Sequence, residues 1–137
     1  MAQMANGAQF VKGTITTDNN NSTYTINFGR TFNNYLFYIE MTDASKTALI
    51  NYGSTYAKMY ACCGMYPAPQ IGEATIGQTM ISRRYKASDG IVDSSAAGIY
   101  NIGNDFITLA NTAVSSSSNP NGFMKGYSYN YYIVEIK

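Results

Sequence analysis

The segment from Gly126 to Lys137, GYSYNYYIVEIK, strongly limits the folds open to this chain because it is apolar on both faces when extended. Successive side chains of a β-strand point to opposite faces. One face then carries Tyr127, Tyr129, Tyr131 and Ile133, and the other carries Tyr132, Val134 and Ile136. A surface strand of an antiparallel sheet is normally apolar on one face only. We therefore expect a central strand that is covered on both faces.

Residues 34–42, NYLFYIEMT, repeat this two-sided pattern and predict a second central strand. From the two segments we expect six residues to fill the core or a subunit interface: Leu36, Phe37, Ile39, Tyr132, Val134 and Ile136. A Val134→Asp substitution is expected to abolish soluble folding. The reason is that an unpaired buried charge costs several kcal/mol, against a total stability of ~5 to 15 kcal/mol.

The rest of the chain also has a period of two, which is typical of strands. Apolar residues alternate through 11–17 and 23–28 on either side of the polar loop Asp18–Asn21, and this predicts a β-hairpin. Further strand-length segments lie at 56–66, 78–86, 99–103 and 105–112. We interpret residues 42–55 as a loop in preference to a helical turn capped by Asp43 or Ser45.

Turn signals separate these strands. Residues 87–98 have the composition of an exposed turn region, and Ser115–Gly122 that of a mobile loop closed by an Asn-Gly turn. Eight or nine strands with no long helix predict an all-β fold, an antiparallel β-sandwich of jelly-roll type. At 137 residues and 15.0 kDa we expect one sandwich domain over 9–137, preceded by an N-terminal arm, residues 1–8, that could dock on another protein.

The N-terminal residues have no basic segment followed by an apolar run and a cleavage site, so we expect no signal peptide. No stretch approaches the roughly 18 apolar residues of a membrane-spanning helix, so no membrane insertion is expected. The formal net charge is +1 and only 12% of residues are charged, which argues against a nucleic-acid partner. The densest basic group is Arg83, Arg84 and Lys86; it fits either a solvated strand edge or a site for phosphate or an acidic partner.

The residue types needed for common catalytic sites are scarce. The sequence contains no histidine, which excludes Ser/His/Asp and Cys/His nucleophile systems and His-ligated metals. We predict no catalytic, cofactor or metal residues. One enzymatic alternative is a glycosidase-type carboxylate pair, Glu40 and Glu135, if the two central strands are neighbours.

Two other motifs bear on metal binding and on disulfide formation. Asp18, Asn20 and Ser22 match the first ligands of a calcium loop, but its turn glycine and terminal glutamate are missing, so we interpret this stretch as a polar turn. Cys62 and Cys63 are adjacent and point to opposite faces of a strand, so we expect reduced, packed thiols in place of a disulfide.

Tyrosine is unusually abundant, with thirteen residues and no tryptophan. Tyrosine offers a rigid, amphipathic surface for stacking and hydrogen bonding, as in carbohydrate recognition. The alternative is that these rings line the core or a subunit interface. The candidate interface or ligand-stacking residues are Tyr127, Tyr129, Tyr131, Tyr35, Arg83 and Arg84.

The two-sided strands also bear on assembly. The outer face of each sheet of a sandwich normally meets water, so an apolar outer face implies a second buried surface. A subunit interface would supply it. We therefore expect a homo-oligomer, most simply a homotrimer or a higher symmetric ring.

In its pattern of residues the chain resembles small all-β virion proteins of tailed bacteriophages. The features are the run GTITTDNNNSTYTINFGRTFNNYLFYIEM, residues 13–41, and the ending Y-x-Y-N-Y-Y-I-V-E-I, residues 127–136. The resemblance implies a virion structural protein made in the host cytoplasm, with other virion proteins and a host-surface glycan as partners. Tail-fibre and receptor-binding knobs are closest in style. The short segment before the first strand favours a small accessory subunit, such as a capsid decoration or head-fibre protein.

Three classes of function therefore stay open. A non-enzymatic virion structural protein is the leading hypothesis, a carbohydrate-binding module that uses surface tyrosines is the second, and an enzyme is the third. A virion subunit predicts symmetric oligomers, a lone module predicts a monomer with exposed tyrosines, and an enzyme predicts converging carboxylates.

Overall fold

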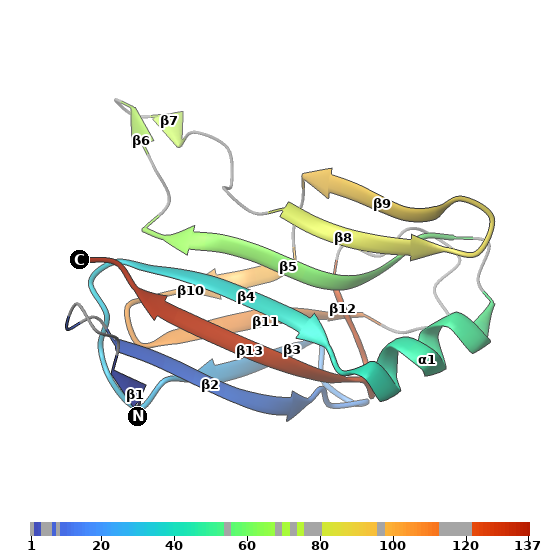
Figure 1. Cartoon of the computed structure of the whole chain (residues 1–137), viewed down its shortest axis with the longest axis horizontal. Coiled ribbons are helices and arrows are strands. Elements are labelled where there is room, and N and C mark those ends of the chain that lie inside the picture. The colour runs from blue at the N-terminus through green and yellow to red at the C-terminus, as the bar shows by residue number, and fades with distance from the viewer. Residues whose placement is uncertain are drawn as a thin grey trace.

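The structure is a computed structural model of the chain, in which the strands form two stacked sheets (Figure 1). It describes residues 2–3, 7, 9–53, 56–67, 70–71, 74–75, 81–95, 98–112 and 122–137. For residues 2–3, 70–71, 74–75, 92–95 and 112 only the backbone is described.

The larger sheet has seven antiparallel strands. Their order across the sheet is β1 (Ala2–Gln3), β2 (Gln9–Thr16), β13 (Ser128–Glu135), β4 (Tyr35–Met41), β5 (Lys58–Tyr66), β8 (Ile81–Lys86) and β9 (Gly90–Ser95). In this sheet β13, the last strand in sequence, lies between β2 and β4. Both predicted central strands are therefore central.

The smaller sheet has four strands. In it β11 (Phe106–Thr112) pairs with β10 (Ile99–Ile102), β3 (Thr23–Asn27) and, in parallel, β12 (Phe123–Met124). Two short strands, β6 (Gln70–Ile71) and β7 (Ala74–Thr75), pair with each other. Of the thirteen strands described, β1, β6, β7 and β12 have two residues each, which leaves nine longer strands. The predicted all-β sandwich of eight or nine strands is confirmed.

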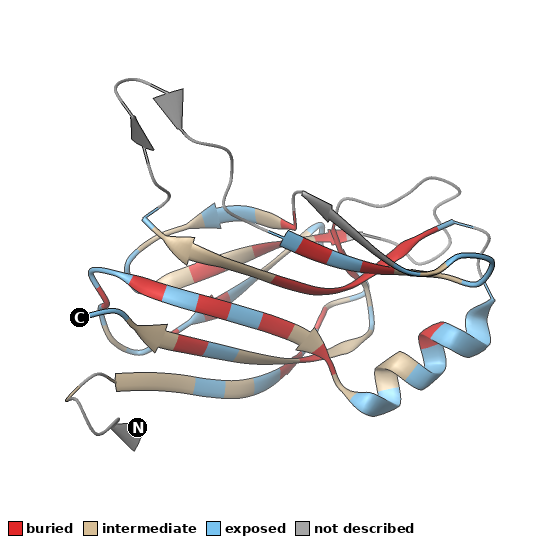
Figure 2. Ribbon diagram, turned by 45° about the horizontal axis from the view of Figure 1, so that its top comes forward, coloured by how far each residue is buried: buried red, intermediate tan, exposed pale blue. Residues whose placement is uncertain are grey.

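The core lies between the two sheets, and alternation decides which residues reach it. Along β4 the residues Tyr35, Phe37, Ile39 and Met41 are buried, and Figure 2 shows the intervening residues more exposed. These four side chains point towards the smaller sheet, which contributes the buried residues Ile26, Ile107, Leu109, Phe123 and Met124. We call this side of the larger sheet the inner face and the opposite side the outer face.

Two tyrosines anchor the aromatic part of this core. The Tyr35 ring meets Phe28 edge to face, with ring centroids 5.3 Å apart, and Tyr129 meets Phe123 in the same way at 4.9 Å. The Tyr35 hydroxyl donates to the Gly103 carbonyl at 2.8 Å. The Tyr129 hydroxyl accepts from the Met124 N–H at 2.9 Å. Because both hydroxyls are hydrogen-bonded, the buried rings leave no polar atom unsatisfied there.

The predicted hairpin of residues 11–28 is wrong, because β2 and β3 belong to different sheets. The Asp18–Asn21 loop instead crosses from one sheet to the other. The Asn111 side-chain amide donates to the carbonyls of Asp18 at 2.7 Å and Asn21 at 3.0 Å, and so fixes the crossing from β11. The Asp18 carboxylate accepts from the Asn20 N–H, and this hydrogen bond holds the pKa of Asp18 below its usual value.

The predicted loop at 42–55 is also wrong, because residues Asp43–Tyr52 form the helix α1. Its N-cap is Thr42, whose hydroxyl accepts from the Ser45 N–H, and it ends at Gly53, which has the left-handed φ of 66°. Only Leu49 of the helix is buried, so the sequence shows no apolar stripe of helical period. Among the described residues no helix is long and apolar enough to cross a bilayer.

Other local predictions have mixed outcomes. In the predicted turn region 87–98, residues 87–89 form a turn and Gly90–Ser95 form the strand β9, so the region is not turn throughout; residues 96–97 lie outside the described residues. Cys62 faces inward and is buried, and Cys63 faces outward and is half-buried; both thiols are free. In the N-terminal arm, Ala2 and Gln3 pair with β2, and its docking role stays a prediction. The Ser115–Asn121 part of the predicted mobile loop lies outside the described residues.

The structure changes the expectation for Val134→Asp and supplies a matched pair. Ile133 is fully buried on the inner face, whereas Val134 is half-buried on the outer face. We expect Ile133→Asp to abolish cooperative folding, because the charge would enter the core without a partner. Val134→Asp should stay soluble and keep a single melting transition. Thermal melting followed by circular dichroism would check this, and equal loss of folding in both variants would contradict the assignment of faces.

Candidate functional site

The outer face of the larger sheet carries an apolar surface across its three central strands. Register places Tyr132, Tyr38 and Cys63 in one cross-strand row and Val134, Leu36 and Met65 in the next. We call these six residues the outer-face strip. Leu36 is 48% exposed, Tyr132 41% and Tyr38 37%, and the other three are half-buried. Together they line a shallow groove of about 390 Å³.

Two tyrosines of the strip form an aromatic pair, which we call the Tyr38–Tyr132 platform. The two rings stack across neighbouring strands, with centroids 6.3 Å apart and planes inclined by 26°. On the far side of Tyr132 the register places Lys12 of β2. The platform thus offers partly exposed aromatic surface next to a cationic side chain, an arrangement that suits contact with an apolar or sugar surface.

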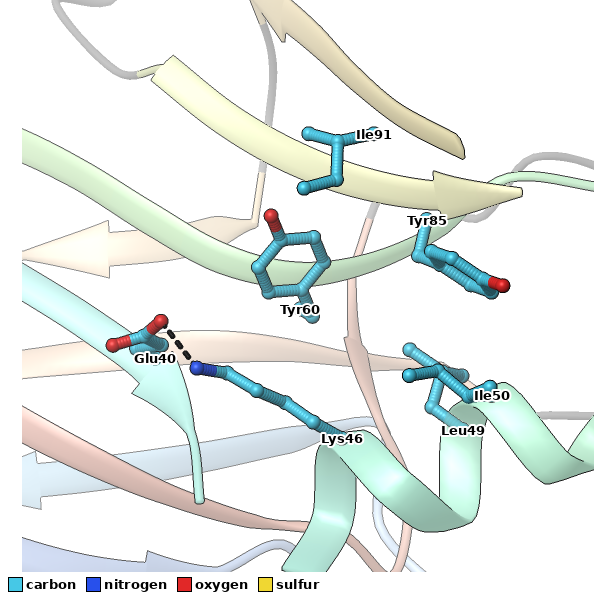
Figure 3. Close-up of a pocket in the computed structure, with 7 residues that line it drawn as sticks. All are labelled: Glu40, Lys46, Leu49, Ile50, Tyr60, Tyr85 and Ile91. Carbon is cyan, nitrogen blue, oxygen red and sulfur yellow. Dashed lines mark hydrogen bonds and ion pairs between the residues drawn. The ribbon is translucent and has the colours of Figure 1, made fainter. Parts of the chain in front are cut away.

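A second hollow lies beside the strip, between α1 and the strands β5, β8 and β9 (Figure 3). Leu49, Ile50, Tyr60, Tyr85 and Ile91 form its apolar walls, and its volume is about 280 Å³. The Tyr60 residue is the extra residue of a β-bulge, where the pairing of β5 with β8 skips a position.

An ion pair closes one end of this cleft. The Lys46 ammonium of α1 lies 2.6 Å from the Glu40 carboxylate of β4 (Figure 3). Glu40 follows Tyr38 on the same face of β4, so the ion pair stands between the cleft and the strip. Burial raises the pKa of Tyr38 to about 12, helped by the negative charge of Glu40 and a hydrogen bond to it. The Tyr38 hydroxyl is therefore protonated at neutral pH.

The predicted candidate tyrosines lie on the other side of the sheet. Tyr35 and Tyr129 are fully buried in the core, so neither ring can stack on a ligand or partner at the surface. Tyr127 and Tyr131 are half-buried and pack against the same core. The Tyr131 ring lies over Gly13, where an added Cβ would come 2.5 Å from the phenol oxygen. The core between the two sheets thus encloses Tyr35 and Tyr129 and covers Tyr127 and Tyr131 in part.

The charged candidates do not form a joint site either. Arg83 and Arg84 are consecutive in β8 and point to opposite faces, Arg83 exposed and Arg84 buried. Lys86 pairs instead with Asp89 at 2.7 Å. Glu40 lies on the outer face and pairs with Lys46, whereas Glu135 lies on the inner side and accepts from the Gln9 N–H. The conceivable Glu40–Glu135 pair is therefore not formed.

The outer-face strip includes residues that sequence reasoning did not select, namely Tyr38, Cys63 and Met65. The alternation in β4 and β13 did separate the two faces, but it could not say which face the smaller sheet would cover. Among the described residues there is no group of three or more His, Cys, Asp or Glu side chains placed to hold a metal ion. Comparisons with protein-family models, with curated proteins and with solved structures find no match to this chain.

The two cysteines should differ in reactivity because they lie on different faces. Burial raises the pKa of Cys62 to about 12, with a smaller contribution from Cys63, so its reactive thiolate is scarce. In a dilute solution of the folded protein we expect the Cys63 thiol to react quickly with a thiol reagent. The Cys62 thiol should react only after unfolding. A Cys63→Ser variant should lose the fast reaction. If the fast reaction persists in that variant, the inward orientation of Cys62 is wrong.

Proposed function

We propose that this chain is a non-enzymatic structural protein of a bacteriophage virion, an exposed accessory subunit of the capsid-decoration, head-fibre or tail-adhesion type. In this role it acts as a homo-oligomer, most simply a homotrimer, and contacts other virion proteins. Its pattern of residues resembles that of such proteins over the run 13–41 and the C-terminal strand. The single observation that supports assembly is the exposed outer-face strip.

The size of the strip fits the centre of an interface between copies. Tyr38 and Tyr132 are 37% and 41% exposed, which leaves roughly 55 to 100 Å² of each accessible, given the 150–250 Å² that an aromatic side chain buries. With Leu36 and the half-buried members, the strip reaches a few hundred Å², as large as the largest apolar patch of an ordinary monomer. A stable interface buries about 800 Å² per partner, with an apolar centre inside a polar rim. Asn130 and the Thr14 hydroxyl supply polar groups beside the strip.

Charge on the strip should therefore dissociate the oligomer without unfolding the subunit. We expect the parent protein to run as a trimer or larger ring by light scattering at micromolar concentration. A Leu36→Lys/Tyr132→Lys variant should lose this trimer or ring and contain at most two subunits, because like charges would meet when the outer faces approach. The matched control is Tyr100→Lys, because Tyr100 is 72% exposed on the smaller sheet. A parent protein of 15.0 kDa would contradict the proposal.

The virion role itself needs a separate measurement. Mass spectrometry of purified phage particles from cells that encode this chain should detect its peptides in a fixed ratio to the major capsid or tail proteins. Absence of the chain from the particles, with the chain present in the cell extract, would overturn the virion role and leave the oligomer untouched.

A second candidate function, carbohydrate binding, is favoured by the Tyr38–Tyr132 platform. The exposed parts of the two rings can contact the apolar face of a sugar, while Lys12 and Glu40 offer hydrogen-bonding groups beside them. If a glycan array identifies a ligand, Tyr38→Ala and Tyr132→Ala should each weaken binding by about tenfold, or about 1.4 kcal/mol. Tyr100→Ala should leave the affinity unchanged. Equal effects of all three substitutions would remove the platform from consideration.

A further inference from the structure

One border of the larger sheet is largely unpaired. The strand β1 covers only the first two residues of β2, with Ala2 opposite Phe10 and Gln3 opposite Gln9. From Val11 to Thr17, no strand in the described part of the chain pairs with β2 on the side away from β13. Figure 1 shows β2 running along this border beyond the short β1. Seven consecutive residues thus form an open sheet edge.

The hydrogen bonds identify the backbone groups that point outward from this edge. The Thr17 N–H donates to the Tyr127 carbonyl, and the Thr17 carbonyl accepts from the Gly126 N–H, so the Thr17 backbone faces the β13 side. Backbone groups alternate in direction along a strand. The backbone N–H and C=O groups of Lys12, Thr14 and Thr16 therefore point to the open side. Those of Phe10 point the same way, toward β1. Each of these three residues is exposed.

This edge carries one of the usual protections against pairing, a single lysine. Natural edge strands are short, bulged, or carry charged side chains such as lysine, a proline, or an inward-pointing charge. The eight residues of β2 contain no proline and pair with β13 without a register shift, so Lys12 is the one residue of β2 that opposes pairing, and it does so only in registers that set it opposite another positive charge. Unpaired N–H and C=O groups in such a row are a template for another strand.

We propose that the edge pairs with the same edge of a second copy, β2 against β2 in antiparallel orientation, about a two-fold axis at Thr14. Thr14 is the middle residue of the open stretch 11–17. An axis there sets Thr14 opposite Thr14 of the second copy, and Lys12 opposite Thr16 in both directions. The backbone groups of Lys12, Thr14 and Thr16 that point to the open edge then all lie in hydrogen-bonded pairs. The larger sheets of the two copies become one continuous sheet.

Neighbouring registers satisfy fewer groups. An axis at Gly13 sets Thr16 opposite Phe10, which already pairs with Ala2. An axis at Lys12 brings two like charges directly opposite each other, which is destabilising. An axis at Ile15 sets Lys12 opposite Asp18, whose carbonyl already accepts from Asn111. Only the axis at Thr14 pairs every open group without a like-charge contact.

This contact does not depend on the virion role or on the outer-face strip, because it uses the border of the sheet. If copies also meet through the strip in a ring, the two-fold edge contact would combine with the ring axis into a dihedral assembly. If the strip binds a glycan instead, the edge contact gives a dimer with two outer faces on the same side of one long sheet.

Site-specific disulfides test both the contact and its register. Opposite residues of a hydrogen-bonded antiparallel pair have Cα atoms about 5.5 Å apart, which a disulfide can span. The half-buried thiol is first removed by Cys63→Ser, while buried Cys62 stays reduced. Under mild oxidation, Thr14→Cys should form a cross-linked dimer at least tenfold faster than Lys12→Cys or Thr16→Cys alone. A mixture of the Lys12→Cys and Thr16→Cys proteins should cross-link as fast as Thr14→Cys.

Other results would overturn the proposal. If Thr14→Cys cross-links no faster than the other two single variants, the pairing or its register is wrong. If Thr14→Cys protein in a cell extract forms disulfides only with other polypeptides, the edge belongs to a different partner. In the Leu36→Lys/Tyr132→Lys background the Thr14→Cys dimer should still form, so the edge contact and the outer-face oligomer can fail separately.

A non-covalent test uses the direction of one N–H group. Thr14→Pro removes an outward-pointing donor that no described group accepts from, and proline is tolerated on an edge strand facing solvent. The control Thr14→Val keeps the N–H and the β-branched shape. In the Leu36→Lys/Tyr132→Lys background, sedimentation should give a dimer dissociation constant at least tenfold higher for Thr14→Pro than for Thr14→Val. The melting temperatures of the two variants should be closely similar. Equal dissociation constants would overturn the edge contact.

Discussion

The larger sheet depends on the insertion of β13 between β2 and β4. β13 pairs with β2 from Phe10 to Thr16 and with β4 from Tyr35 to Met41, whereas β2 and β4 do not pair with each other. Buried backbone groups need hydrogen-bond partners, so both flanking strands rely on this one. The same strand also contributes Tyr129 and Ile133 to the core. Hydrogen bonding and core packing therefore converge on eight residues.

The two faces of the larger sheet are both apolar but differ in how their tyrosines are used. On the inner face, Tyr35 and Tyr129 are enclosed and their hydroxyls bond to backbone groups of the smaller sheet and its connections. On the outer face, Tyr38 and Tyr132 keep part of each ring exposed. The inner tyrosines thus stabilise the sandwich, while the outer ones are available to a partner. This division gives the outer face its place in the proposed function.

The strand content and the two central strands were predictable because the period of two is a local property of the sequence. The hairpin and the helix were not. The polar loop after β2 is held by Asn111, which lies about ninety residues away, so no local signal shows that it crosses between sheets. The helix α1 buries only Leu49 and has no apolar stripe for sequence reasoning to find. Its N-cap, Thr42, is a residue type that is also common in turns, so it does not by itself indicate the start of a helix.

The candidate site was predictable only in part, for a related reason. Alternation sorts Tyr131 from Tyr132 and Leu36 from Phe37, but it leaves open which set faces the smaller sheet. The strip and the Tyr38–Tyr132 platform also depend on the register between β13, β4 and β5, which long-range pairing sets. The row of open backbone groups on β2 is invisible in the sequence, since it depends on where β1 stops.

The order of synthesis gives the central position of β13 a further consequence. While the ribosome makes the residues between β4 and β13, the nascent chain holds two strands that lack their shared neighbour. Both are then able to accept a strand from elsewhere, and the only matching strand is the last of those described. In a crowded polysome, or during refolding at high concentration, the C-terminal strand of one copy can fill the gap in another. The topology therefore predicts exchange of β13 between copies as a misfolding route, and a low protein concentration favours the intramolecular closure, because exchange requires two chains to meet.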